Sequence, residues 1–215
     1  MSRNDHLEAL HEIRSMMERS SRFISLSGWS GVGAGVVALA GAAVAFWYLG
    51  RLPFEEAPLI GYESLESPGR WGISYGRFFF LNALIVLIAA LGTAIFFTTR
   101  KARRKGHKVW DGTTSRLPIH LFIPLIAVGI FILGLLYHDL PGLAAPAMLV
   151  FYGLGLFNAS KFTLEELRNL GLLETGLGLA ALFNPVYGLE CWTLGFGLLH
   201  IIYGTYMNWK YERPE

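Results

Sequence analysis

Long uninterrupted apolar runs constrain this chain more than any other feature of its sequence. The run LNALIVLIAALGTAIFF, residues 81–97, carries no charge and is apolar on every face of a helix. A membrane β-strand would instead alternate apolar and polar residues over about ten positions. A helix satisfies its own backbone hydrogen bonds inside lipid. The run therefore predicts a membrane-spanning α-helix.

Six such runs approach the ~20 residues that are needed to cross a hydrocarbon layer of ~30 Å. Only 16% of the chain is charged, whereas soluble domains carry about 25%, and the charges cluster between the runs. We expect an all-α, polytopic membrane helix bundle whose six transmembrane helices form three hairpins within one domain, residues 28–209. The predicted spans are residues 28–49, 78–98, 118–137, 141–158, 164–183 and 189–209.

The distribution of Lys and Arg predicts the orientation of the bundle. If consecutive spans alternate in direction, all but three of the 18 Lys and Arg residues fall on one side of the membrane. The exceptions are Arg51, Arg70 and Arg77. Loops that are rich in Lys and Arg stay in the cytoplasm. We therefore expect a multi-pass protein of the bacterial inner membrane with both termini, including the tail 210–215, in the cytoplasm.

The first 27 residues predict a cytoplasmic amphipathic helix. Leu7, Leu10, Ile13 and Met17 recur at spacings of three and four residues, which places them on one helical face. This helix would either pack on the cytoplasmic face of its own bundle or dock onto a partner or a second copy, and both interpretations stay open.

A basic block follows the second predicted span. Its Lys and Arg residues act as a topology determinant or as a contact for anionic lipid, where each base near the surface contributes about 1 kcal/mol. The candidate lipid-contact residues are Arg100, Lys101, Arg103, Arg104, Lys105 and Lys108. The loop is too short for a nucleic-acid recognition fold, so nucleic acid is not an expected partner.

Glycines inside the predicted spans indicate close helix packing. Gly31 and Gly35 form a G-x-x-x-G pair, and further glycines lie in the last predicted hairpin. Small residues let helix backbones approach in a membrane, where lipid supplies no hydrophobic drive for association. The expected partners are membrane lipids and either further copies of the chain or a larger membrane complex.

Two ionisable residues lie inside the last predicted hairpin. At 1.5 Å per residue, Glu174 is roughly 10 Å and His200 roughly 13 Å from the cytoplasmic boundary. The short link NPVYG makes the two helices antiparallel neighbours, so the side chains meet if their faces agree. A lone carboxylate at this depth is costly or protonated, and an imidazole, or Tyr203, Thr175 or Asn158, would reduce the cost.

The candidate intramembrane polar site is therefore Glu174, His200 and Tyr203. Intramembrane ionisable residues are candidates for function because their burial is expensive. Three interpretations stay open: a buried structural contact, a proton or ligand site, and a contact with another subunit.

The sequence lacks the motifs that would indicate an enzyme or a metal site. The chain has no H-E-x-x-H pair and no nucleophile elbow, and its one cysteine, Cys191, excludes a disulfide framework. We expect no enzymatic activity, no cofactor and no metal site.

Two segments resemble known families. The stretch RSMMERSSRFISLSGWSGVGAGVVALAG and the five spans after it resemble uncharacterised six-span membrane proteins of Bacteroidetes-like bacteria, a likeness that implies no activity. The stretch GLGLAALFNPVYGLECWTLGFGLLHIIYG, residues 176–204, is similar to one hairpin of the HdeD-like acid-resistance membrane family. The second resemblance implies a small, stress-related inner-membrane protein with no catalytic residues, although the YHDLPG link and the long first loop depart from its pattern.

Together these features favour a non-enzymatic integral inner-membrane protein, an accessory subunit, a scaffold or a stress-related protein that acts through helix packing and partner contacts. The alternative is a small proton- or ion-linked transporter or channel that uses Glu174 and His200.

Overall fold

The computed structural model describes residues 27–55, 65–104 and 116–211. These residues form helices joined by turns, and an isolated bridge pairs Pro68 with Ser74. The long helices are α2 (Gly28–Leu49), α3 (Tyr75–Arg104), α4 (Arg116–Tyr137), α5 (Ala144–Ala159) and α6 (Glu166–Phe183). The last helical segment, residues 188–211, joins α7 (Gly188–Trp192), the π-helical η6 (Thr193–Leu199) and α8 (His200–Tyr211). Short 3-10 turns connect the helices at Arg70–Gly72, Pro141–Leu143, Ser160–Phe162 and Pro185–Tyr187. The described part of the chain is all-α.

Among the described residues, five helical stretches are long and apolar enough to cross a membrane, which makes the structure compatible with a membrane helix bundle. They are Gly28–Leu49, Tyr75–Arg104, Pro118–Tyr137, Pro141–Phe162 and Pro185–Tyr211. Helix α6 is not among them. Its 18 residues include three charged ones, Glu166, Arg168 and Glu174, so its composition alone does not mark it as a span.

The helices coincide with the predicted ranges to different degrees. The first range, 28–49, has the same bounds as α2, whereas α3 extends beyond 78–98 at both ends and covers 30 residues. The last range, 189–209, is not one regular helix, because η6 interrupts it with a wider π-helical turn. The predicted amphipathic helix, residues 1–27, lies outside the described residues except for Ser27.

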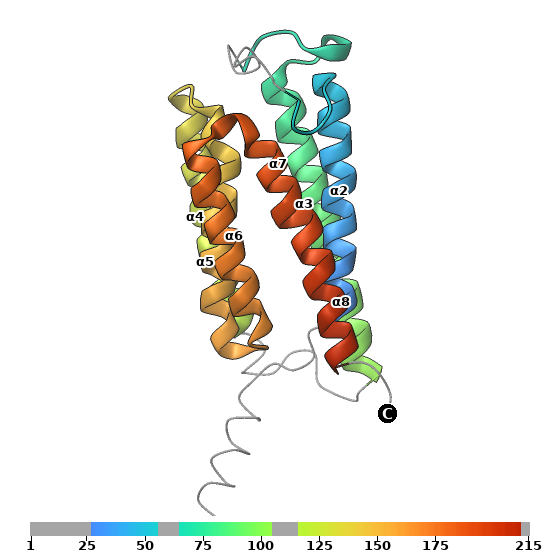
Figure 1. Cartoon of the computed structure of the whole chain (residues 1–215). Helices are drawn as coiled ribbons and strands as arrows, with labels where there is room; N and C mark the ends of the chain where they lie inside the picture. The colour runs from blue at the N-terminus through green and yellow to red at the C-terminus, as the bar shows by residue number, and fades with distance from the viewer. Residues whose placement is uncertain (1–26, 56–64, 105–115, 212–215) are drawn as a thin grey trace, which may run out of the picture.

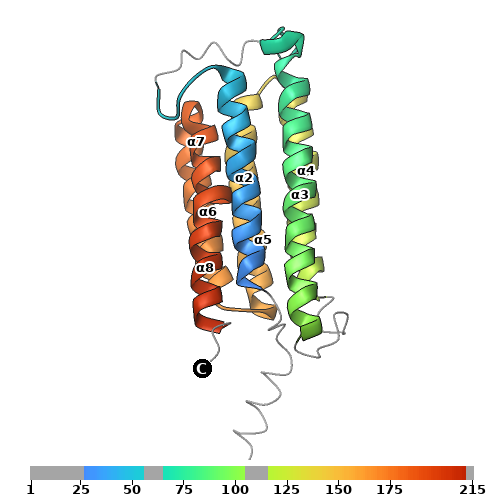
Figure 2. The same ribbon diagram turned by 90° about the vertical axis from the view of Figure 1, so that its right-hand side faces the viewer.

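The helices pack as two groups, and the axes of all the long helices are nearly aligned with one another (Figures 1 and 2). In the first group, α2 packs against α3, η6 and α8. In the second group, α5 packs against α4 and α6. We call the surface where α5 and α6 meet the last helical segment the seam. The chain thus pairs its first long helix with its last.

Glycines bring the helix backbones together within each group. A Cβ atom at Gly204 would lie 2.6 Å from the backbone nitrogen of Val32, so α8 and α2 meet backbone to backbone. In the second group, a Cβ atom at Gly153 would lie 2.5 Å from the carbonyl oxygen of Gly171. Contacts this short leave no room for a larger side chain, as expected for helices that associate by small residues in lipid.

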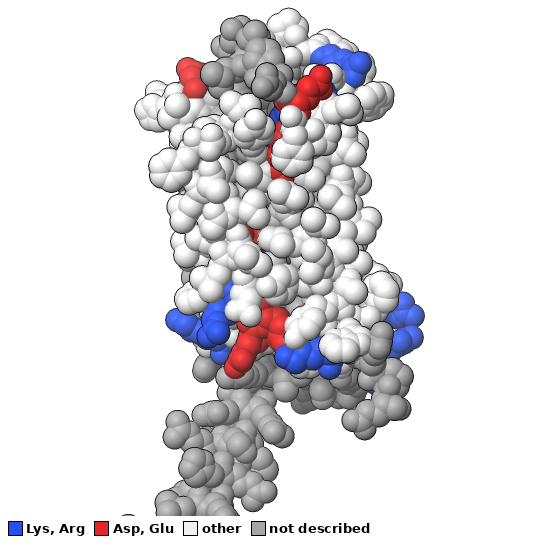
Figure 3. Space-filling view, in the orientation of Figure 1, with Lys and Arg blue, Asp and Glu red and all other residues white. Residues whose placement is uncertain are grey.

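Charged side chains gather toward the two ends of the molecule, and a largely uncharged band separates them (Figure 3). Aromatic side chains line the end at which α2 stops. Tyr48 stacks on Phe78 with ring centroids 3.7 Å apart, and Trp47 meets Trp71 edge to face at 4.9 Å. Tryptophan and tyrosine at helix ends are typical of a membrane–water interface.

Candidate functional site

Glu174 and His200 meet at the seam. Glu174 lies in the middle of α6 with none of its surface exposed, and His200 is the first residue of α8 with 6% exposed. The imidazole Nδ1 lies 3.3 Å from the carboxylate Oε1. The structure therefore brings together the two residues that the sequence placed at similar depth.

The hydrogen bonds of His200 determine where its proton lies. Nδ1 is 3.0 Å from the carbonyl oxygen of Gly195, and Nε2 is 2.8 Å from the hydroxyl oxygen of Tyr152. A carbonyl oxygen can only accept, so Nδ1 carries a hydrogen. In the neutral imidazole Nε2 then accepts from Tyr152, and in the imidazolium it donates to Tyr152.

The π-helical η6 ends directly before His200. It contains Gly195, whose carbonyl accepts from the imidazole Nδ1. A Cβ atom at Gly195 would collide with Oε2 of Glu174 and lie 2.5 Å from Cδ2 of Leu149. The glycine therefore lets the carboxylate fit against the backbone of the last helical segment. Single π-helical turns inside helices are frequent at functional sites.

The carboxylate of Glu174 has no hydrogen-bond partner in the described structure. Both Oε1 and Oε2 are buried and unpaired, although Nδ1 of His200 is within ion-pair distance of Oε1. The two observations agree, because the Nδ1 hydrogen serves Gly195 and not the carboxylate. A charged carboxylate without hydrogen bonds is very costly in a low-dielectric interior. A proton on Glu174 or on His200 removes or balances that charge.

Tyr203, the third predicted member of the site, makes no hydrogen bond with Glu174 or His200 among the described residues. It packs against the cluster of Leu156, Leu164, Leu167, Leu170 and Met207. The phenol that reaches His200 belongs to Tyr152 on α5. The other suggested partners are also engaged away from Glu174, because the Thr175 hydroxyl donates to the carbonyl of Gly171 and Asn158 lies 3.3 Å from Nδ1 of His120.

Sequence reasoning missed Tyr152, although a depth count would have found it. Tyr152 stands seven residues before the end of α5, and Glu174 stands eight residues after the start of α6. The two helices are antiparallel neighbours, so these positions lie at the same level. The signal was a phenol inside an otherwise apolar run.

A second acid–base contact crosses the seam at the end where α8 stops. Lys210 Nζ donates to Oε1 of Glu166 at 2.6 Å, and the Tyr211 hydroxyl donates to the same oxygen at 2.8 Å. The other carboxylate oxygen, Oε2, is buried and has no hydrogen-bond partner. The sequence TLEE, residues 163–166, fits a capping box in which Thr163 caps the helix and Glu166 reaches back to it. In the structure the Glu166 carboxylate binds Lys210 and Tyr211 of α8 instead, and the Thr163 N–H donates to the carbonyl of Ser160.

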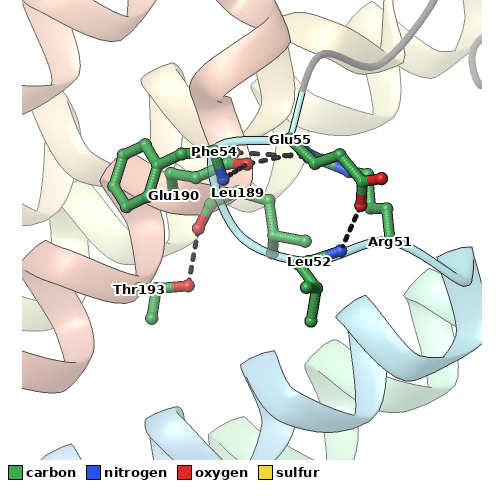
Figure 4. A network of polar contacts seen from close by, with 7 residues as sticks. All are labelled: Arg51, Leu52, Phe54, Glu55, Leu189, Glu190 and Thr193. Atoms are coloured by element: carbon green, nitrogen blue, oxygen red, sulfur yellow. Dashed lines mark hydrogen bonds and ion pairs between the residues drawn. The ribbon is translucent and has the colours of Figure 1, made fainter.

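A third contact lies at the opposite end, between the end of α2 and α7 (Figure 4). Arg51 binds Glu190 through two bonds, Nη1 to Oε1 at 2.7 Å and Nη2 to Oε2 at 3.3 Å. The backbone N–H of Phe54 donates to Oε1 at 3.2 Å. Glu190 has 2% of its surface exposed. The paired, bidentate geometry satisfies both carboxylate oxygens, unlike those of Glu174.

The predicted lipid-contact residues divide at the end of α3. Arg100, Arg103 and Arg104 are exposed, whereas Lys101 is buried with 8% of its surface exposed. Burial removes Lys101 from a lipid-facing surface. Lys105 and Lys108 lie outside the described residues.

Among the described residues, no three His, Cys, Asp or Glu side chains lie close enough together to hold a metal ion. His120 stacks on Phe162 with ring centroids 4.5 Å apart. His138 and Asp139 are exposed at the turn after α4.

No family model, no curated protein and no solved structure matches this chain. The two resemblances drawn from the sequence stay predictions.

Proposed function

We propose that this chain is a non-enzymatic inner-membrane protein with six crossings, which binds and releases a proton at Glu174 and couples that step to the packing of its two helix groups. The observation that carries the proposal is the Glu174 side chain. It is fully buried, its two oxygens lack hydrogen-bond partners, and His200 lies 3.3 Å away.

The topology part of the proposal adds α6 to the five candidate spans, so that the crossings number six and α6 is the fifth of them along the chain. Its 18 residues measure about 27 Å at 1.5 Å per residue. Two of its three charges, Glu166 and Arg168, lie in the first turn, and the third is buried against His200. The start of α2 also packs against α8, because a Cβ atom at Gly28 would lie 2.5 Å from the nitrogen of Asn208. An even number of crossings places both of these ends on one side of the membrane.

The proton part follows from the cost of charge. A carboxyl group removed from water is stable only as the protonated, neutral acid or as a carboxylate that is strongly paired. Glu174 shares its site with one further group that can hold a proton, the imidazole of His200. A carboxylate beside a neutral imidazole therefore takes up one proton, and that proton lies either on Glu174, beside a neutral imidazole, or on His200, as an imidazolium beside the carboxylate. The hydroxyl of Tyr152 satisfies Nε2 in both forms.

Infrared titration of the purified protein in lipid tests the proposal. A protonated carboxyl group buried in the protein gives a C=O stretching band separate from that of solvated acids. We expect this band to change with pH, to disappear in Glu174→Gln, and to persist in Glu55→Gln, which removes an exposed carboxylate. An unchanged band in Glu174→Gln would overturn the proposal.

The exposed faces of α3 and α4 favour a second candidate function, that of an accessory or scaffold subunit. Gly92, Gly129 and Gly134 face open space, with no atom within 4 Å of an added Cβ. Small exposed residues on apolar helices suit association with another helix. Purification in mild detergent tests this candidate. A partner or oligomer that is lost in Gly129→Leu but kept in Gly176→Leu supports it, and a strict monomer argues against it.

A further inference from the structure

Glu166 and Glu174 present unpaired oxygens to the same surface. Within the described residues, the buried side-chain nitrogen and oxygen atoms that lack a hydrogen-bond partner are Oε2 of Glu166 and both oxygens of Glu174. The two residues are eight positions apart with Leu170 midway, so all three share one face of α6. This face meets the last helical segment, because Glu166 binds Lys210 and Tyr211 and Glu174 contacts His200.

Among the described residues at the opposite end, the buried acid is Glu190, and both of its carboxylate oxygens are paired. Oε1 of Glu190 accepts from Arg51 and from the N–H of Phe54, and Oε2 accepts from Arg51. Its partners come from the end of α2 and the turn after it, and not from α6. Within residues 27–55, 65–104 and 116–211, the buried carboxylate oxygens without a hydrogen-bond partner therefore lie between Glu174 and the Lys210 end of the seam.

From this arrangement we infer that protons reach Glu174 along the seam from the Lys210 end, with Glu166 as the entry acid and Leu170 as the barrier between the two carboxylates. The inference rests on the proposed function of Glu174. In each transfer Glu166 takes a proton from water on Oε2 and becomes a neutral acid. It then releases that proton through water to Glu174, so Glu166 ends as a carboxylate and Glu174 as a carboxylic acid.

Leu170 closes this route in the structure. It is buried with 6% of its surface exposed and clusters with Leu156, Leu164, Leu167 and Met207. Eight residues separate the two acids, about 12 Å along the helix axis. A buried water needs two to four polar partners, and the leucine cluster supplies none. Proton transfer therefore requires the seam to open between Glu166 and Glu174.

The seam is the part of the molecule best able to open. Within each helix group, glycines bring backbones into direct contact, as between Gly204 and Val32 or Gly153 and Gly171. The polar contacts that cross the seam are made by side chains. Lys210 and Tyr211 bind Glu166, and His200 contacts both Glu174 and the hydroxyl of Tyr152. Side-chain contacts reform after a small separation, so the two groups can part without unfolding.

Thiol accessibility tests the route. In a Cys191→Ser background, Leu170→Cys places a thiol on the inferred route. Ala181→Cys places a matched thiol seven residues beyond Glu174, at a position with 1% of its surface exposed. A membrane-impermeant thiol reagent is applied to sealed, oriented vesicles from either side. We expect Leu170→Cys to react from the Lys210 side at least tenfold faster than Ala181→Cys reacts from either side. Met207→Cys repeats the measurement from the other wall of the seam.

Faster reaction of Ala181→Cys from the Arg51 side would overturn the inference, and so would the absence of reaction at both 170 and 207.

A kinetic measurement separates this failure from that of the proposed function. After a pH jump, Glu166→Gln should slow the appearance of the Glu174 infrared band at least tenfold and leave its final size unchanged. Glu165→Gln, which changes the neighbouring exposed acid, serves as the control. If Glu166→Gln leaves the rate unaltered, Glu166 is not on the route. If the unsubstituted protein shows no Glu174 band, the proposed function itself is wrong.

Discussion

Gly195 holds the position at which the last helical segment comes closest to the Glu174 carboxylate. Any Cβ there would collide with Oε2 and press on Leu149. We expect Gly195→Ala to lower the free energy of unfolding by about 1–3 kcal/mol, as overpacking does. Gly176→Ala is the control, because no atom lies within 4 Å of its added Cβ. It should change stability by at most about 1 kcal/mol. Equal stability of the two variants, measured by denaturation in detergent, would contradict this packing.

Tyr152 fixes the orientation of the His200 ring through its hydroxyl group. Tyr152→Phe keeps the ring and removes only that oxygen, which leaves Nε2 unpaired at a cost of about 1–3 kcal/mol. We expect the pH midpoint of the Glu174 infrared band to move in Tyr152→Phe and to stay in place in Tyr203→Phe. A shift in the second variant alone would restore Tyr203 to the site.

These residues show which parts of the site a sequence can place. Glu174 and His200 were predictable because a short link fixes the depth of both residues relative to one membrane boundary. For Tyr203, position along a helix gives depth but not the direction in which the side chain faces, so the sequence could not decide whether its hydroxyl reaches His200, and in the structure Tyr152 makes that contact. The π-helical turn between Thr193 and Leu199 has no sequence rule comparable to a proline kink, so the rotation that it adds was not predictable.

At the scale of elements, a buried ion pair joins the turn after α2 to α7. Arg51 and Glu190 are largely buried, with side-chain exposures of 14% and 1%. Removing one partner leaves the other charge buried, which costs about 3–5 kcal/mol, whereas replacing both by apolar residues is often nearly neutral. We therefore expect Arg51→Met or Glu190→Leu alone to destabilise strongly and the double variant to recover most of the loss. Additive losses in the double-mutant cycle would show that the pair is not coupled.

Helix bounds were the most predictable feature at this scale. The thickness of the hydrocarbon layer sets the length of a spanning helix, and charged residues mark where its apolar run stops. Range 28–49 has the same bounds as α2. Helix α3 exceeds its range because charged residues up to Arg104 extend the helix beyond the apolar run. Pairing between helices was less predictable. The G-x-x-x-G pair of Gly31 and Gly35 indicated a close contact, but only the structure assigns η6 and α8 as the partner.

At the scale of the whole molecule, the crossing status of α6 decides the orientation of everything after it. If α6 crosses, the turn before it and the turn after it lie on opposite sides of the membrane, and α8 ends on the side where α2 begins. If α6 stays on one side, both turns share that side, Lys210 and Arg213 move to the opposite side, and the excess of Lys and Arg falls from 15 against 3 to 13 against 5. Lys161 precedes α6 and Asn184 follows it, and both are exposed. In a Cys191→Ser background, we expect an impermeant thiol reagent to label Lys161→Cys from the cytoplasmic side and Asn184→Cys from the opposite side.

Glu55→Cys, at the turn after α2, is the reference and should label from the same side as Asn184→Cys. Labelling of Lys161→Cys and Asn184→Cys from one side would remove the sixth crossing, and with it the depth at which Glu174 and His200 are proposed to exchange a proton.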